Sequence, residues 1–187
     1  MLTVEFIAAL LTLWSVYLTT NKHMLSWPVG IWAVVMYAAV FFDQKLYADF
    51  ILQAFFAIQG VIGFIMWKYK GEVNRNQITK IETLTNKQRL FYLLPMIIVY
   101  LSAAYLLSTY TNASVPYIDS LVATLSLFAN YLLIKRKIDN WYIWIVVNML
   151  YIGLFTFKGL YVSMWLYVLL LGLAVKGYLD WKKIMAK

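Results

Sequence analysis

The chain contains an apolar unit that occurs twice, in the same direction and without a gap. Residues of the first copy have their counterparts 114 positions later. The aromatic and glycine positions that recur at this spacing include the pairs Tyr17/Tyr131, Trp27/Trp141, Tyr37/Tyr151, Gly63/Gly177 and Trp67/Trp181. Self-similarity at a fixed spacing is the mark of a repeat architecture. The fold is therefore expected to consist of two like halves.

The composition favours lipid over water as the solvent for most of the chain. Hydrophobic residues make up 64% of the 187 residues and charged residues only 13%, against about 45–50% and 25% in soluble domains. There is no cysteine, and the one histidine, His23, lies between apolar runs, where a solvated side chain is the usual outcome. With neither residue inside a span, and no paired carboxylates, an integral-membrane enzyme has little support.

Seven apolar runs approach the length of about 20 residues that crosses a bilayer as a helix. They are Val4–Thr20, Trp27–Phe42, Leu46–Trp67, Leu90–Ser108, Ile118–Ile134, Trp141–Phe157 and Leu160–Trp181. The sequence therefore predicts an all-α membrane protein with seven transmembrane helices. We expect one transporter domain over 1–187, with a first repeat at 1–70, a linking helix at 88–110 and a second repeat at 115–187. Three helices, one linker and three helices make the repeats parallel, the plan of transporters of the SWEET type.

The basic residues predict the orientation. All but two of them lie in or next to the connections that follow the first, third, fifth and seventh runs, while only Lys45 and Lys158 fall on the other side. The crowded side should be cytoplasmic, so the N-terminus is expected outside and the C-terminus inside. The longest polar stretch, 68–89, mixes its basic residues with Glu72 and Glu82, which favours a solvated cytoplasmic linker over a nucleic-acid or lipid-headgroup patch.

Polar and aromatic residues at helical spacing mark a candidate binding face. Residues i, i+3, i+7 and i+10 share one side of a helix, and a buried amide or carboxylate facing lipid is costly, so such stripes should face the interior of the bundle. Glycines 60 and 63 should let a neighbouring backbone approach the same helix. The candidate substrate-binding residues are Trp141, Trp144, Asn148, Tyr151, Asp49, Gln53, Phe56 and Gln59. No metal site and no cofactor site is predicted.

Some of these residues have a second interpretation. Trp27, Trp67 and Trp181 fall at predicted membrane ends, where an interfacial tryptophan belt is the commoner arrangement. Gln59 and Asn130 fit either ligand contact or hydrogen bonding between helices, and Lys176 should reach toward the cytoplasmic interface. Trp144, Asn148 and Gln53 lie deeper in the membrane, and ligand contact explains them better than contact between helices.

The two copies differ where they are polar. Asn148 has Val34 as its counterpart, and Gln53 has Tyr167. A single asymmetric ligand on the axis between the halves would produce such a difference.

The expected cargo is an organic cation. Four acidic residues lie toward the outer side, where basic residues are few: Glu5, Asp43, Asp49 and Asp119. An outer mouth with this balance attracts cations. Deeper in the membrane, each aromatic face adds ~0.5–2 kcal/mol to the binding of a diffuse positive charge.

Three stretches resemble the PnuC-type family, the pyridine nucleotide uptake transporters. Trp141-Tyr-Ile-Trp144, followed by Asn148, is similar to that family's W-x-x-W motif. The stretches 46–53 and 158–181 are similar as well, so the resemblance covers nearly the whole chain. Carried over residue by residue, it implies binding roles for Trp141, Trp144, Asp49 and Gln53.

The resemblance also implies a biological role. It implies uptake of a vitamin across a bacterial cytoplasmic membrane by facilitated diffusion, without a cofactor. The typical cargo is nicotinamide riboside, thiamine is the nearest alternative, and riboflavin is carried by relatives. A cytoplasmic kinase would trap the product, and members of the family can assemble as trimers. A membrane receptor or adaptor that transports nothing is a more distant alternative.

Overall fold

The computed structural model of the chain describes residues 2–43, 47–73, 80–157 and 161–186. Within these ranges it forms seven helices, each long and apolar enough to cross a membrane, as the sequence predicts. They are α1 (Leu2–Thr20), α2 (Ser26–Asp43), α3 (Tyr47–Val73), α4 (Asn86–Tyr110), α5 (Pro116–Ile134), α6 (Asp139–Phe157) and α7 (Tyr161–Met185). Some residues used in the sequence analysis lie outside these ranges. They are Leu46 and Leu160, where two spans were expected to start, the basic residues Lys45, Arg75 and Lys158, and the 158–160 part of the family resemblance.

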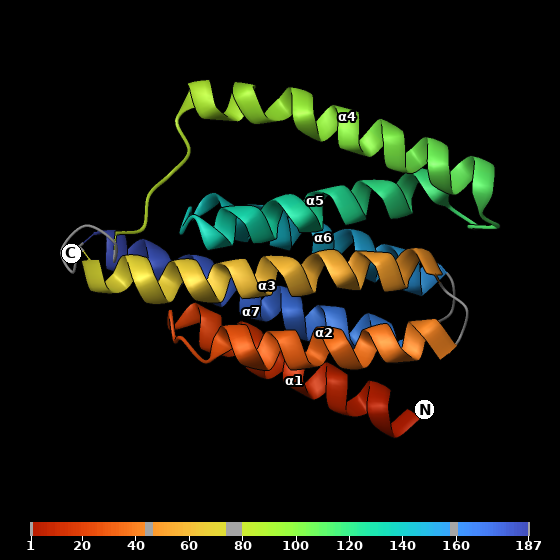
Figure 1. Cartoon of the computed structure of the whole chain (residues 1–187), viewed down its shortest axis with the longest axis horizontal. Coiled ribbons are helices and arrows are strands. Elements are labelled where there is room, and N and C mark those ends of the chain that lie inside the picture. Colours follow the sequence, from red (N-terminus) through yellow and green to blue (C-terminus); the bar gives the residue numbers. More distant parts are fainter. Residues whose placement is uncertain (1, 44–46, 74–79, 158–160, 187) are drawn as a thin grey trace.

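Six helices pack side by side in a closed ring, in the order α1, α2, α3, α5, α6, α7 and back to α1. Helix α4 lies outside this ring, against α5 (Figure 1). We call α1–α3 the first half and α5–α7 the second half. The halves meet where α1 packs on α7 and where α3 packs on α5, and these two contacts are equivalent under the repeat. The prediction of two parallel three-helix repeats joined by a linking helix is confirmed.

The repeat extends to the backbone of the turns. Lys22 and Arg136, which are 114 residues apart, both have a φ of 54°, a conformation uncommon outside glycine. In each turn the next residue donates its N–H over 2.9 Å to a helix carbonyl, from His23 to Leu18 and from Lys137 to Leu132. Both turns are thus Schellman motifs, which satisfy the last carbonyls of α1 and α5.

Each half contains the same contact between tryptophan and glycine. The Trp27 and Trp67 rings meet edge to face at 5.3 Å, and the Trp141 and Trp181 rings do so at 5.6 Å. The first ring of each pair lies directly on a glycine of the third helix of its half, either Gly63 or Gly177. We call these two units the tryptophan–glycine interlocks.

The interlocks explain why tryptophan and glycine recur together in the sequence. All four indoles are buried in one core cluster. The expectation that Trp27, Trp67 and Trp181 form an interfacial belt is therefore wrong. The missing glycine side chain opens a slot between neighbouring helices, and each ring gains more contact there than it would against lipid headgroups.

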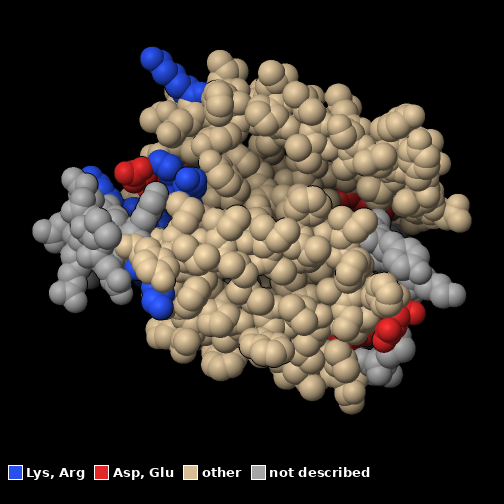
Figure 2. All heavy atoms as spheres, viewed as in Figure 1, with Lys and Arg blue, Asp and Glu red and all other residues tan. Residues whose placement is uncertain are grey.

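The charges separate along the bundle, and Figure 2 shows Lys and Arg gathered at one end of the visible face. We call this the basic end; it holds the α1–α2 and α5–α6 turns. At the opposite, acidic end lie Glu5, Asp43, Asp49 and Asp119. The N-terminus lies at the acidic end and the C-terminus at the basic end (Figure 1). Which end faces the cytoplasm stays a prediction.

The segment before α4 is docked rather than solvated throughout. Glu82 forms a parallel bridge with Lys137 through its backbone, and their side chains pair at 2.6 Å. This hydrogen bond and the charge of Lys137 lower the pKa of the Glu82 carboxyl. Ile81 and Leu84 are buried beside it. The described part of the linker is thereby attached to the turn between α5 and α6.

Gly177→Ala should lower the melting temperature of the purified protein in detergent. A new Cβ at this position would lie 2.5 Å from the Trp141 ring, and overpacking of this kind costs about 1–3 kcal/mol. Gly172→Ala in the same helix is the matched control, because a Cβ there meets nothing within 4 Å. Scanning fluorimetry would measure both variants, and equal melting temperatures would contradict a tight interlock.

Candidate functional site

Two indole hydrogen bonds join the halves at the basic end. Trp67 donates its Nε1–H to the Ile134 carbonyl over 3.2 Å, from α3 to α5. Trp181 donates its Nε1–H to the Thr19 carbonyl over 3.4 Å, from α7 to α1. The two bonds are nearly equivalent under the repeat, and they lie in the buried tryptophan cluster. The interior of the ring is therefore closed by packed side chains at this end.

Basic side chains surround the closed end. The Arg136 guanidinium lies 4.7 Å from the centre of the Trp67 ring. Burial lowers the pKa of Arg136. Burial, and after it the charge of Arg136, lowers the pKa of Lys22. These two repeat-equivalent cations thus lie within electrostatic range of each other. Lys176 donates to Thr20 Oγ1 over 3.3 Å at the basic end and so links α7 to α1, which is compatible with the expected reach toward that interface.

The four candidate residues of α6 differ in what they touch. Trp141 is only 2% exposed and belongs to an interlock, so the protein itself covers its ring. Trp144 is half-buried and packs on the edge of the tryptophan cluster. One turn further, Asn148 is 4% exposed, and no hydrogen-bond partner of its amide is found among the described residues. Asn148 therefore lies inside the bundle with an amide that could still bond a ligand.

Tyr151, the last of the four, belongs to an aromatic stack in the acidic half of the bundle. Its ring lies 4.3 Å from the Tyr167 ring and 5.6 Å from the Phe155 ring. The first half repeats part of this stack, with the Tyr37 and Phe41 rings at 5.9 Å. The stack is nevertheless unequal, because Tyr167 has Gln53 as its counterpart in the first half.

The candidates of α3 approach this region from the other half. Asp49 is exposed in the first turn of α3, and its carboxylate lies within electrostatic range of the Tyr151 and Tyr167 hydroxyls. Gln53 and Phe56 are half-buried one and two turns deeper. The structure thus brings Asp49 together with Tyr151, from opposite halves, around the interior of the ring.

Gln59 lies apart from the aromatic stack. Its Nε2 donates to the Leu127 carbonyl over 3.0 Å, and its Oε1 accepts from Asn130 Nδ2 over 3.1 Å. Both partners are on α5, so these bonds link the two halves. They show that Gln59 and Asn130 bond between helices, one of the two interpretations of the sequence.

Several residues of this region are missing from the sequence-based candidates. Thr124 on α5 is buried, and its Oγ1 has no hydrogen-bond partner in the part of the chain that the structure describes. Phe155 and Tyr167 belong to the aromatic stack of the second half, and Tyr37 stacks on Phe41 in the first. The signal for Thr124 was its i, i+4 spacing from Ser120 within an apolar helix. Among the residues that the structure describes, no three potential metal ligands lie together.

A family model described as nicotinamide mononucleotide transporter matches residues 2–183. The chain belongs to this family. It is 21% identical over 202 residues to the nicotinamide riboside transporter PnuC of Escherichia coli K12, covering 95% of this chain and 84% of the relative. It is 30% identical over 172 residues to the nicotinamide riboside transporter PnuC of Neisseria mucosa, covering 84% and 64%.

The same family supplies a solved structure with this fold. The match is to a crystal structure of the vitamin B3 transporter PnuC, with a TM-score of 0.79 and 25% sequence identity. It covers 98% of this chain and 82% of that chain. The family resemblance of the sequence is thereby confirmed.

The Gln59–Asn130 pair should contribute to stability through coupling between the halves. Hydrogen bonds between membrane helices are coupled by about 0.5–1.5 kcal/mol in double-mutant cycles. We expect Gln59→Leu and Asn130→Leu each to lower the free energy of unfolding, and the double variant to lose less than the sum. Unfolding in mixed micelles would measure the cycle, and strict additivity would mean that the bond carries no net energy.

Proposed function

We propose that this chain carries nicotinamide riboside across the bacterial cytoplasmic membrane by facilitated diffusion. The observation that carries the proposal is Asn148, which is only 4% exposed and lies on α6 between Trp144 and the Tyr151 stack. A flat, positively charged ring with hydroxyls and an amide suits such surroundings, since aromatic faces bind diffuse cations and an amide binds hydroxyls. Two relatives named nicotinamide riboside transporter support the same cargo.

The charge distribution favours a riboside over a mononucleotide, although the family description names the latter. A phosphate group would have to pass the acidic end, where Glu5, Asp43, Asp49 and Asp119 lie. Like charges repel at such an entrance, whereas a cationic riboside is attracted. The phosphate is then best added after transport, by a cytoplasmic kinase that would trap the product. This chain itself would perform no chemical reaction and use no cofactor.

Alternating access would use the two halves as its moving parts. We assign one transporter domain to 1–187, with halves at 1–70 and 115–187 and the linking helix at 88–110. In this state the indole bonds of Trp67 and Trp181 hold the basic end closed. Breaking both bonds would let the halves part there, while the acidic end closes around the cargo.

The candidate residues divide into two roles under this proposal. Trp144, Asn148 and Tyr151 would contact the cargo from the second half, with Asp49, Gln53 and Phe56 opposite them. Trp141 and Gln59 would border the site, because one is held in an interlock and the other bonds α5. Thr124, with its unpaired buried hydroxyl, is a further candidate contact. We also propose a trimer as the assembled form, which size-exclusion chromatography with light scattering would test.

Vesicle transport is the direct test of the function. Purified protein reconstituted into liposomes should equilibrate labelled nicotinamide riboside without an ion gradient, and titration calorimetry should detect its binding. Thiamine, the nearest alternative, would be measured in parallel. Tight thiamine binding without nicotinamide riboside binding would reassign the cargo, and binding without movement across the bilayer would make the protein a receptor.

Asn148→Leu and Trp144→Ala should each weaken the binding of nicotinamide riboside. Each loses contacts of about 1–3 kcal/mol, which corresponds to roughly fivefold to a hundredfold in affinity. Trp165→Ala is the matched control, since Trp165 is an exposed tryptophan on the outer surface of α7. Calorimetric titration would compare the three, and unchanged affinity in both α6 variants would remove that helix from the site.

Single cysteines can test the orientation, because the natural chain has none. We expect Asn112→Cys, at the acidic end, to react with a membrane-impermeant maleimide in intact cells. Lys183→Cys, at the basic end, should react only after the cells are opened. Both positions are exposed, so accessibility within the protein does not distinguish them. The reverse labelling pattern would place the C-terminus outside.

A further inference from the structure

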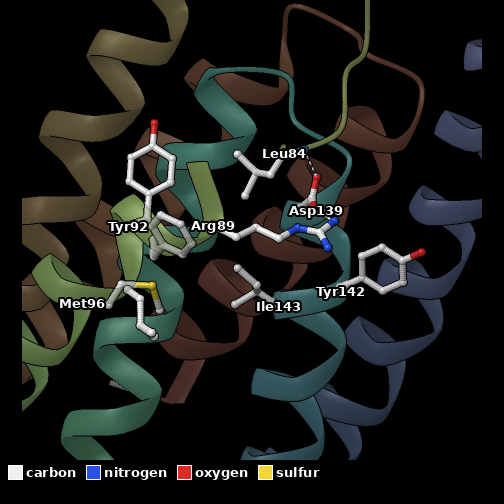
Figure 3. A pocket seen from close by; sticks show the side chains of 9 residues that line it. Leu84, Arg89, Tyr92, Met96, Asp139, Tyr142 and Ile143 are labelled. Atoms are coloured by element: carbon white, nitrogen blue, oxygen red, sulfur yellow. Dashed lines mark hydrogen bonds and ion pairs between the residues drawn. The ribbon is translucent and has the colours of Figure 1, made fainter. Parts of the chain in front are cut away.

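A groove of about 470 Å³ lies between α4 and the second half, near the basic end (Figure 3). It is lined by residues of α4, α5 and α6 and by Leu84 of the linker. We propose that this α4 groove binds one anionic phospholipid. The headgroup would lie on Arg89, and an acyl chain would lie along Met96, Phe128 and Ile143. The assignment to the cytoplasmic leaflet rests on the proposed orientation, whereas lipid binding itself does not.

The polar part of the groove presents a fixed guanidinium. Arg89 Nη2 donates to Asp139 Oδ1 over 2.9 Å, and Asp139 Oδ2 accepts the Leu84 N–H over 2.7 Å. Both carboxylate oxygens are thus engaged, and they hold Arg89 across the groove (Figure 3). The Arg89 side chain is still 56% exposed. A guanidinium has five N–H donors, so it can bind a phosphate with those that remain.

The surroundings of Arg89 carry a net positive charge. Asp139 is paired with Arg89, and Glu82 is paired with Lys137. Lys135 has no such acidic partner among the described ion pairs, and its Nζ lies 5.8 Å from the centre of the Tyr131 ring. Tyr131 in turn contacts Tyr92, which lines the groove. Basic pockets between transmembrane helices are a recurrent site for anionic headgroups.

The rest of the groove is apolar and lies deeper. Met96 is seven residues beyond Arg89 on α4, which is about 10 Å along a helix. Phe128 and Ile143 face the same space from α5 and α6. Water does not fill an apolar cavity, because it finds no partners there. Helix α4 packs along α5 and reaches α6 through the Arg89–Asp139 pair, so the groove between them can open to the hydrocarbon and admit an acyl chain from the side.

One molecule of lipid matches the whole groove. A free phosphate would use only the guanidinium, and a purely apolar ligand would leave it unused. A phospholipid has its charge at the membrane surface and its chains at depth, in the same order as the groove. Bound lipid would then fill the space between the linking helix and the second half.

Lipid titration in detergent tests this proposal. Native mass spectrometry of the delipidated protein should show about fivefold greater retention of phosphatidylglycerol than of phosphatidylcholine with the same acyl chains. This is the preference expected when one basic side chain near the membrane surface contacts the headgroup. Arg89→Gln should abolish this preference, while Lys183→Gln, at another site of the basic end, should keep it. Met96→Trp should fill the apolar part and remove both lipids, whereas Ile97→Trp, on the exposed side of α4, should retain them.

Four results would overturn the proposal. The first two are equal retention of both lipids by the natural protein and unchanged lipid retention by Met96→Trp. The third is competition by inorganic phosphate alone. The fourth is a dimer of the natural protein that dissociates in Met96→Trp, because a second copy of the chain would then occupy the groove. If Arg89→Gln fails to fold, Met96→Trp still decides, because it leaves the ion pair with Asp139 intact. Nicotinamide riboside titration of the same samples separates the two proposals: lipid loss with intact vitamin binding leaves the proposed function standing, and the reverse leaves the lipid site standing.

Discussion

The packing of an indole ring against a glycine backbone organises this protein. In each half, the first tryptophan enters a slot that only glycine leaves open, and the second tryptophan meets its edge. The same second tryptophans, Trp67 and Trp181, then donate across to the opposite half. One unit therefore joins helices within a half and also closes the ring at its basic end. Because both halves use it, the closure has the symmetry of the repeat.

Under the proposed function, this arrangement leaves the acidic half of the interior for the cargo. The tryptophan cluster occupies the ring up to Trp144, and beyond it the helices present Asn148 and the tyrosine stack. The two halves differ at this depth, because the first has Gln53 where the second has Tyr167. Structural contacts are thus repeated, whereas the proposed ligand-facing positions are not, and a single unsymmetrical cargo on the axis would produce this pattern.

Much of the fold could be predicted because its signals are local. Span length and the placement of basic residues predict seven helices from neighbouring residues alone, and the recurrence at 114 residues, read directly along the sequence, predicts two parallel halves. The direction of a tryptophan at a span end is not local, since Trp27 turns inward only because Gly63 lies on the next helix. Likewise, Gln59 and Asn130 could be singled out as polar, but their bond joins different halves. The face of a helix on which a residue lies can be predicted from the helical period. Which residues pair between helices can be seen only in the assembled ring.

The linking helix introduces an asymmetry that the repeat does not contain. Asp139 anchors the start of α4 to the second half through Leu84 and Arg89, and its counterpart in the first half is Leu25, which can form neither bond. Lys137 adds a second attachment through Glu82. Helix α4 therefore belongs mechanically to the second half, although it follows the first in the chain. Any motion of the halves then moves three helices against four, and the described contacts that must change are those of α1 with α7 and of α3 with α5.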